Sequence, residues 1–254
     1  MKHMILASLM TFMLSSEALA KIYKKDRVLV IVSELDTGGL PELAPLYTIM
    51  EQLTQLNAES LLAPYYAEVK ILTNQEANFE NYKQTLRALA LREEIKAIDV
   101  ILSLHGLPKK LRFTDKLWEV TEMETSFLEA RSYRERDLVS HLKKKLRMVY
   151  NLSCFGSSHN SALYRMGFDV SNGSVNVNAN AEMEFLPVID SWKKGKGFKS
   201  GFKLSNTPVA LYLSDEPVRK LGREQNNALK SANSKKLFFG FINTTITTDP
   251  REVY

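Results

Sequence analysis

The sequence predicts an α/β fold in which a mostly parallel β-sheet is flanked by helices. Short apolar runs, rich in β-branched residues, alternate with longer segments whose apolar residues recur every three or four positions. Runs of the first kind are typical of strands buried on both faces, and segments of the second kind are typical of helices packed on a sheet. Their alternation favours βαβ units, and therefore parallel strands.

The apolar runs place the strands. Four clear runs predict strands over residues 28–32, 69–72, 100–104 and 146–152. Two weaker runs predict further strands over residues 175–177 and 237–242. The mixed stretch over residues 109–120 predicts a β-hairpin or an irregular excursion.

Helical spacing fills the intervals between the strands. The first helix is expected to begin near Pro41, a residue favoured at helix starts, and Asn74 is expected to cap the second. Three further helices are expected over residues 134–145, from residue 157 to 166, and over residues 181–193. In the first helix the expected core-facing stripe consists of Leu43, Leu46, Met50, Leu53 and Leu56.

The first twenty residues read as a secretory signal peptide. A short basic start is followed by a mostly apolar stretch over residues 4–14, and Ala18-Leu19-Ala20 fits the small-x-small cleavage pattern. The apolar stretch is short for a membrane span; an uncleaved anchor or a buried first helix is the alternative. We therefore expect an exported protein, periplasmic or secreted, whose mature chain forms a single domain over residues 21–254 without stable membrane insertion.

Cysteine usage is the sharpest compositional feature. Cys154 is the only cysteine in the 254 residues, so the chain cannot form an internal disulfide. A lone cysteine in an exported chain is either an inert buried thiol or a free reactive one. The net charge of +5 is mild and does not by itself indicate nucleic acid, and no zinc-finger or RNA-binding signature is present.

Two of the predicted strands end in residues that can carry chemistry. His105 follows the strand over residues 100–104, and Cys154 follows the strand over residues 146–152. Sites in parallel sheets form outside the carboxyl ends of the strands, so neighbouring strands would bring both side chains to one crevice. An imidazole there activates a thiol and then protonates a leaving amine. The N–H groups of Gly106 and Cys154 are the expected oxyanion donors.

These residues resemble those of caspase-like cysteine peptidases, the group that contains caspases, metacaspases, legumain, clostripain and gingipain. An apolar strand ending in His-Gly (residues 101–106) precedes an apolar strand ending in Cys-x-Gly (residues 149–156). The separation of 154 − 105 = 49 positions is close to the value of about 50 in caspases. The resemblance implies the caspase–haemoglobinase fold and a peptide or protein substrate.

The resemblance covers residues 27–203, and it has departures. The stretch from Gly167 to Gly195, with its Ser-x-Gly-Ser and Val-Asn-x-Asn-Ala sequences, is similar to the segment after the cysteine helix in bacterial relatives. Caspases carry Gln-Ala before the cysteine and metacaspases Asp-Ser, whereas this chain has Leu152-Ser153, so no P1 preference carries over. Where caspases place a P1-binding arginine, this chain has Glu34 and Asp36, which would suit Lys or Arg at P1.

Several residues offer alternatives to these assignments. His159 could replace His105 as the partner of Cys154, and His141, among lysines, is expected to be exposed. Asn160 stands where a cysteine-dependent phosphatase needs arginine, and no Gly-x-Ser-x-Gly elbow or Walker loop occurs. We expect no metal and no cofactor. The sequence thus predicts an exported cysteine endopeptidase with a Cys-His dyad; a catalytically inactive caspase-like binding protein is the alternative, and the oligomeric state is open.

Overall fold

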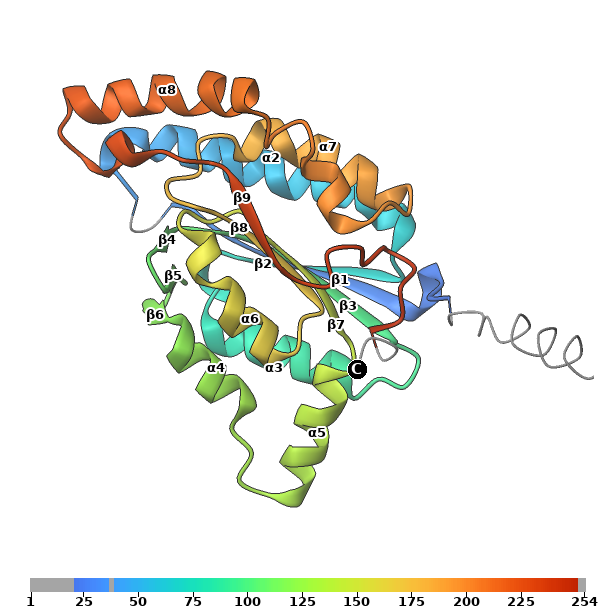
Figure 1. Ribbon diagram of the computed structural model, residues 1–254. Coiled ribbons are helices and arrows are strands. Elements are labelled where there is room, and N and C mark those ends of the chain that lie inside the picture. Colours follow the sequence, from blue (N-terminus) through green and yellow to red (C-terminus); the bar gives the residue numbers. More distant parts are fainter. Residues whose placement is uncertain (1–20, 37–38, 251–254) are drawn as a thin grey trace, which may run out of the picture.

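The computed structural model describes residues 21–36 and 39–250 of the chain (Figure 1). The predicted signal peptide, residues 1–20, lies outside this part. A six-stranded sheet forms the centre, in the order β2-β1-β3-β7-β8-β9. All neighbouring pairs are parallel except β8 and β9, which are antiparallel. The strands are β1 (Arg27–Glu34), β2 (Glu68–Thr73), β3 (Ala97–Leu104), β7 (Leu146–Asn151), β8 (Val170–Ser174) and β9 (Lys236–Gly240).

Helices cover both faces of this sheet. One face packs against α3 (Phe79–Ala90), α4 (Val120–Leu128), α5 (Tyr133–Lys143) and α6 (Asn160–Met166). The other face packs against α2 (Ala44–Leu62) and α7 (Ala181–Lys193). Figure 1 shows α8 (Pro208–Glu224) lying outside α2, at the top of the view. The predicted α/β fold class, a mostly parallel sheet flanked by helices, is confirmed.

A second, three-stranded antiparallel sheet leaves the main sheet directly after β3. It consists of β4 (Gly106–Leu107), β5 (Lys110–Arg112) and β6 (Leu117–Glu119). This sheet confirms the hairpin expected over residues 109–120. It starts at the residue after His105, so its first strand lies beside the candidate site.

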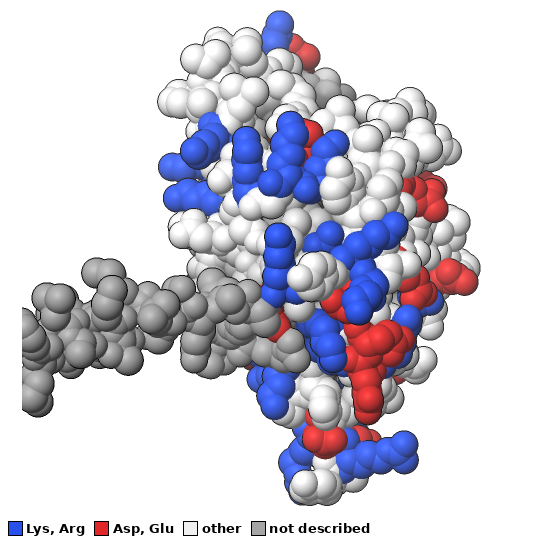
Figure 2. Space-filling model, turned by 90° about the vertical axis from the view of Figure 1, so that its right-hand side faces the viewer, with Lys and Arg blue, Asp and Glu red and all other residues white. Residues whose placement is uncertain are grey.

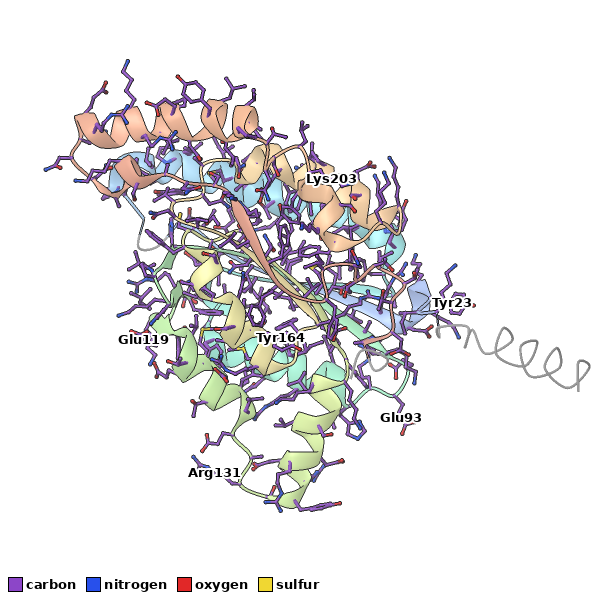
Figure 3. All side chains as sticks on the ribbon, viewed as in Figure 1. Tyr23, Glu93, Glu119, Arg131, Tyr164 and Lys203 are labelled. Carbon is purple, nitrogen blue, oxygen red and sulfur yellow. The ribbon has the colours of Figure 1, made fainter. Side chains whose placement is uncertain are left out.

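Two apolar cores stabilise the layers, one on each face of the sheet. The core under α3 is rich in aromatic contacts, such as Phe79 against Phe113 and Trp118. The core under α7 centres on Tyr150, which packs against Phe185, Phe198 and Phe202. Figure 3 shows the side chains crowded on both faces of the sheet.

Three expectations from the sequence need correction. The strand expected over residues 175–177 is β8, which lies earlier and is fully buried although its sequence is Val-Ser-Asn-Gly-Ser. Asn74 begins a short 3-10 turn, and Asn78 caps α3 by accepting a hydrogen bond from the Asn81 N–H (2.8 Å). In α2 most of the predicted stripe does not face the sheet: Leu46, Leu53 and Leu56 are exposed, while Met50 packs against the core. The buried face holds Glu51, Thr54, Ala58 and Leu62.

Charged side chains of both signs lie on the face of the molecule drawn in Figure 2. Figure 2 shows one face, on which Lys and Arg gather in the upper part and both signs intermingle below. In the stretch over residues 193–203 most lysines are exposed while Phe198 and Phe202 are buried, and Lys193 and Lys194 pair with Asp190. No helix in the described ranges has the length and apolar character that crossing a bilayer requires.

A buried ion pair joins β3 to β7 near their amino ends. Arg147 contacts Asp99 through two hydrogen bonds, Nε to Oδ1 (2.9 Å) and Nη2 to Oδ2 (2.6 Å), and both side chains are fully buried. The Tyr66 hydroxyl also donates to Asp99 Oδ2 (2.6 Å). Arg147 Nη1 bonds the Ile246 carbonyl (2.5 Å), which ties the segment after β9 to the same end of the sheet.

The pair coincides with a register shift. The β3–β7 pairing changes from Ile98↔Leu146 to Asp99↔Met148, which leaves Arg147 without a counterpart. The offset therefore changes from 146 − 98 = 48 to 148 − 99 = 49. A bulge of this kind changes the direction of one side chain, here that of Arg147. The bidentate hydrogen bond from Arg147 to Asp99 stabilises the bulge.

We predict that Arg147→Met lowers the free energy of unfolding by about 3–5 kcal/mol, because Asp99 is left buried and uncompensated. The double variant Arg147→Met, Asp99→Leu should be more stable than the single variant, since no charge is then left unpaired. Urea unfolding followed by circular dichroism measures both. Arg131→Met is the control, because that exposed arginine pairs with Glu129 at the surface and should leave the free energy of unfolding nearly unchanged. Equal losses for Arg147→Met and Arg131→Met would contradict the assignment.

Candidate active site

The register of β3 and β7 sets His105 and Cys154 level with each other. The last paired residues of these parallel strands are Leu102 and Asn151. His105 and Cys154 each lie three positions further on, at the carboxyl edge of the sheet. Their spacing of 49 in the sequence equals the offset between the strands after the bulge, so the structure brings together the two residues that the sequence singled out.

His105 and Cys154 line one pocket of about 330 Å³. Its walls come from the carboxyl ends of the strands, from α2, from the segment between β8 and α7, and from the region of α8 and the turn after it. Most of the lining is apolar, including Leu46 and Met50 of α2 and Val218 and Leu221 of α8. An apolar pocket with a few polar groups converging on it is the usual form of a small-molecule or side-chain binding site.

His105 is held by the loop after β1. Its Nε2 donates a hydrogen bond to the Leu35 carbonyl oxygen (2.7 Å). Because a carbonyl oxygen only accepts, this bond places the proton on Nε2 and leaves Nδ1 as the acceptor nitrogen. The Tyr47 ring packs edge-on against the imidazole (4.7 Å between centroids), and a side chain at Gly39 would collide with both rings. Burial lowers the pKa of His105, so the ring is neutral near pH 7.

Cys154 occupies a tight turn between β7 and the 3-10 turn Gly156–Ser158 that precedes α6. Phe155 takes the left-handed conformation (φ +54°), and its N–H donates to the Asn176 carbonyl (2.8 Å). The Asn178 N–H donates to Cys154 Sγ (3.4 Å). The residue is partly exposed, whereas the sulfur itself is desolvated against the protein.

The resting thiol is protonated. Burial raises the pKa of Cys154, and the Asn178 N–H and the positive charge of Lys236 oppose this rise without cancelling it. The sequence predicts a thiol that is activated by the neighbouring imidazole of His105. The structure corrects this for the substrate-free protein, because desolvation outweighs the groups that favour the anion.

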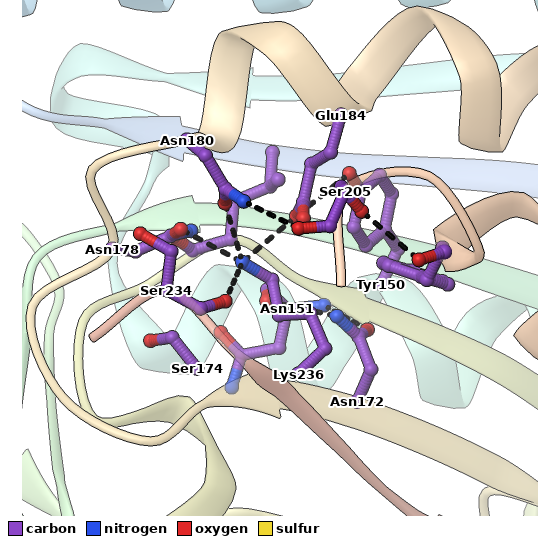
Figure 4. Close-up of polar contacts among 12 residues, drawn as sticks. Tyr150, Asn151, Asn172, Ser174, Asn178, Asn180, Glu184, Ser205, Ser234 and Lys236 are labelled. Atoms are coloured by element: carbon purple, nitrogen blue, oxygen red, sulfur yellow. Dashed lines mark hydrogen bonds and ion pairs between the residues drawn. The ribbon is translucent and has the colours of Figure 1, made fainter. Parts of the chain in front are cut away.

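A buried polar network supports the segment that contacts the sulfur (Figure 4). The Lys236 amino group, at the start of β9, pairs with Glu184 of α7 (2.9 Å) and donates to Asn178 Oδ1 (2.7 Å) and Asn180 Oδ1 (3.3 Å). Asn178 Nδ2 in turn donates to the Leu152 carbonyl (2.8 Å). Burial lowers the pKa of Lys236, and the Glu184 carboxylate opposes that change. The network fixes the Asn178 N–H against Sγ and holds a buried cation near it.

Gly106 and His159 join the cysteine turn to β4. A side chain at Gly106 would collide with the Cys154 carbonyl oxygen, so the close approach of these two backbones needs glycine. His159 is fully buried, with Nε2 bonding the Leu107 carbonyl (2.9 Å) and Nδ1 bonding Asn151 Nδ2 (3.2 Å). Burial lowers the pKa of His159 to about 4. With both nitrogens used, His159 positions the turn, and it is not placed to act as the partner of Cys154.

The two acidic residues expected in the P1 pocket, Glu34 and Asp36, lie outside the pocket that holds His105 and Cys154. Glu34 is buried in β1, and Asp36 accepts a hydrogen bond from Thr48 Oγ1 (2.9 Å). Neither contributes to the lining of the pocket, whereas Glu182, in the first turn of α7, does. Sequence inspection missed Glu182 and Lys236 because each is far in sequence from His105 and Cys154 and belongs to no local motif. His141 is exposed, as expected. Across residues 21–36 and 39–250, His, Cys, Asp and Glu form no group of three or more suited to a metal ion.

The fold and the site define an α/β protein with a histidine and a cysteine in one pocket at the carboxyl edge of a parallel sheet. No protein-family model matches the chain, and no curated protein matches it in sequence. Among solved structures, the chain is similar to that of pro-sf-caspase-1, with 11% sequence identity and a TM-score of 0.46. The similarity covers 88% of this chain and 94% of that one.

We predict that removing the buried charge at position 236 makes Cys154 harder to ionise. In the double variant Lys236→Met, Glu184→Gln, the midpoint of the pH profile for alkylation by iodoacetamide should move to higher pH, because a cation that favours the thiolate is lost. The single cysteine makes the labelling specific, and mass spectrometry reads its rate. Lys235→Met, an exposed neighbour, is the control and should leave the midpoint unchanged. A midpoint unmoved in the double variant would show that Lys236 does not act on the thiol.

Proposed function

We propose that this chain is a cysteine endopeptidase, with Cys154 as the nucleophile and His105 as the general base and acid. The observation that carries the proposal is the level placement of these residues in one pocket, with His105 oriented through Leu35. A nucleophile, a base within the same pocket and a third group that orients the base form the arrangement used in nucleophilic catalysis.

The proposed reaction begins when substrate closes the pocket. The Cys154 S–H proton passes to His105 Nδ1, and the thiolate attacks the scissile carbonyl carbon to form a C–S bond. The N–H groups of Gly106 and Cys154 are the proposed donors to the resulting oxyanion. Collapse of this intermediate breaks the C–N bond, and His105 returns its proton to the leaving amine. The products are a free amine and a thioester on Cys154.

Water then completes the cycle. His105 Nδ1 accepts a proton from a water molecule, and the hydroxide adds to the thioester carbonyl. The C–S bond breaks, the acid is released and His105 protonates the Cys154 sulfur. Both groups are neutral at rest. The thiol proton leaves with the amine and water supplies its replacement, so the protein ends the cycle with the charge it had at the start.

A second function is favoured by a specific observation. The raised pKa of Cys154 and the replacement of the caspase residues before it by Leu152-Ser153 are what a chain that binds peptides without cleaving them would carry. In that reading the same pocket holds a peptide side chain and Cys154 is inert. The two functions differ in turnover, and so they are separated by one set of variants.

We predict that the purified chain cleaves members of a peptide library and that Cys154→Ala abolishes cleavage. His105→Ala should lower kcat by about 10²–10⁴-fold, the usual contribution of a general acid–base group. His141→Ala is the matched control, because His141 is exposed and outside the pocket, and its activity should equal that of the unaltered chain. Cleavage products are measured by liquid chromatography with mass spectrometry. No cleavage by the unaltered chain, together with peptide binding that survives Cys154→Ala, would establish the binding function instead.

We further propose that the protein is exported, to the periplasm or beyond the cell, and that residues 1–20 are removed. The basic start, the apolar stretch and Ala18-Leu19-Ala20 support this. Amino-terminal sequencing of protein recovered from its own cells should begin at or near Lys21. A mature protein that retains Met1 would contradict export by cleavage.

A further inference from the structure

The pocket beside Cys154 carries one charged group that no other residue neutralises. Glu182 lies in its wall, at the start of α7, and is partly buried. It makes no hydrogen bond and no ion pair with any residue of the described chain, whereas the next acidic residue of the helix, Glu184, is paired with Lys236. An unpaired carboxylate in a mostly apolar pocket is costly unless a ligand compensates it.

Several observations support a ligand role for Glu182 over a structural one. Burial alone raises the pKa of its carboxyl group, and no neighbouring cation lowers it. A place in the first turn of a helix favours an acidic residue, yet no backbone N–H of α7 bonds the Glu182 carboxylate. The described lining of the pocket contains no Lys, Arg or Asp, and its His105 and Cys154 are both neutral at rest.

The rest of the wall fits the stem of a long side chain. Leu152, Val177 and Ala181, from the end of β7 and the segment leading into α7, line the pocket together with Met50 of α2 and Leu221 of α8. Methylene groups gain from contact with such walls, and a cationic head group gains from a carboxylate beyond them. A volume of about 330 Å³ leaves room for a long side chain next to the reacting carbonyl.

We propose that this pocket selects a substrate with an unbranched cationic side chain, lysine or arginine, on the acyl side of the scissile bond, and that Glu182 pairs with its head group. The inference rests on the proposed peptidase function and names its substrate class. The acidic residue that binds the substrate side chain is then Glu182 of α7. Glu34 and Asp36, which the sequence suggested for this role, do not line the pocket. Acidic substrates are disfavoured because they would bring a second negative charge beside Glu182.

The test uses peptidyl chloromethyl ketones that differ only in the side chain next to the ketone: arginine, leucine or aspartate. These reagents alkylate Cys154, and their rates report the pocket whether or not the protein turns over substrate. The arginine reagent should react at least about tenfold faster than the leucine reagent, as a charge-assisted contact allows. Glu182→Gln should remove most of that advantage and leave the leucine rate within about threefold, since the apolar walls are unchanged.

Two further variants keep the test decisive. Glu182→Lys should reverse the preference, so that the aspartate reagent becomes faster than the arginine reagent. Glu59→Gln, at an exposed position of α2, should match the unaltered chain, and thermal unfolding of each variant checks that it is folded. An arginine rate no higher than the leucine rate, or an arginine advantage that survives Glu182→Gln, would overturn the proposal. If the ketone preferences hold but no peptide is cleaved, the pocket assignment stands and the peptidase function fails.

Discussion

The parallel pairing of β3 with β7 is the constraint on which the rest of the site depends. The bulge at Arg147 changes the strand offset from 48 to 49, and only the second offset sets His105 level with Cys154. The bidentate bond from Arg147 to Asp99 holds that bulge at the opposite end of the same two strands. The fully buried ion pair thus has a role in register, which accounts for a polar cluster among the apolar residues of β3 and β7.

Burial then sets the chemical state of the two residues. The same desolvation that lowers the pKa of His105 raises that of Cys154, so both favour their neutral forms. The Lys236–Glu184 pair is almost neutral as a unit, but its cation is turned toward Asn178, whose N–H contacts the sulfur. The Cys154 thiolate is therefore disfavoured in the resting protein. The positive charge of Lys236 in β9 favours the thiolate once a proton acceptor is in place.

Much of the fold could be predicted from the sequence, because strands such as β1 and β3 consist mainly of consecutive apolar residues. Every residue of these two strands is buried, as expected for strands covered on both faces. The strand β8 could not, since its buried residues Ser171, Asn172 and Gly173 resemble a turn. Their burial is stabilised by long-range partners: Asn172 bonds the backbone of Asn151, and Gly173 packs against Gly156.

The prediction of the buried face of α2 was wrong for a related reason. Glu51 accepts a hydrogen bond from the Leu35 N–H (3.0 Å), and this contact buries the Glu51 side of the helix and exposes most of the leucines. His105 and Cys154 could be identified from the sequence because each follows a recognisable strand. Glu182 and Lys236 could not, because only tertiary packing brings them near the site.

In the proposed peptidase, the reacting residues and the outer wall of the pocket come from different elements. His105, Gly106 and Cys154 lie just after the carboxyl ends of β3 and β7. The outer wall of the pocket comes from Val218, Leu221 and Leu229, which lie late in the chain. These residues are positioned by α8 and the 3-10 turn Ala228–Ser231, where the Lys230 backbone approaches Gly222 too closely for any larger residue. For the proposed peptidase, substitutions in α7 and α8 can therefore alter the substrate preference without moving His105 and Cys154 at the strand ends.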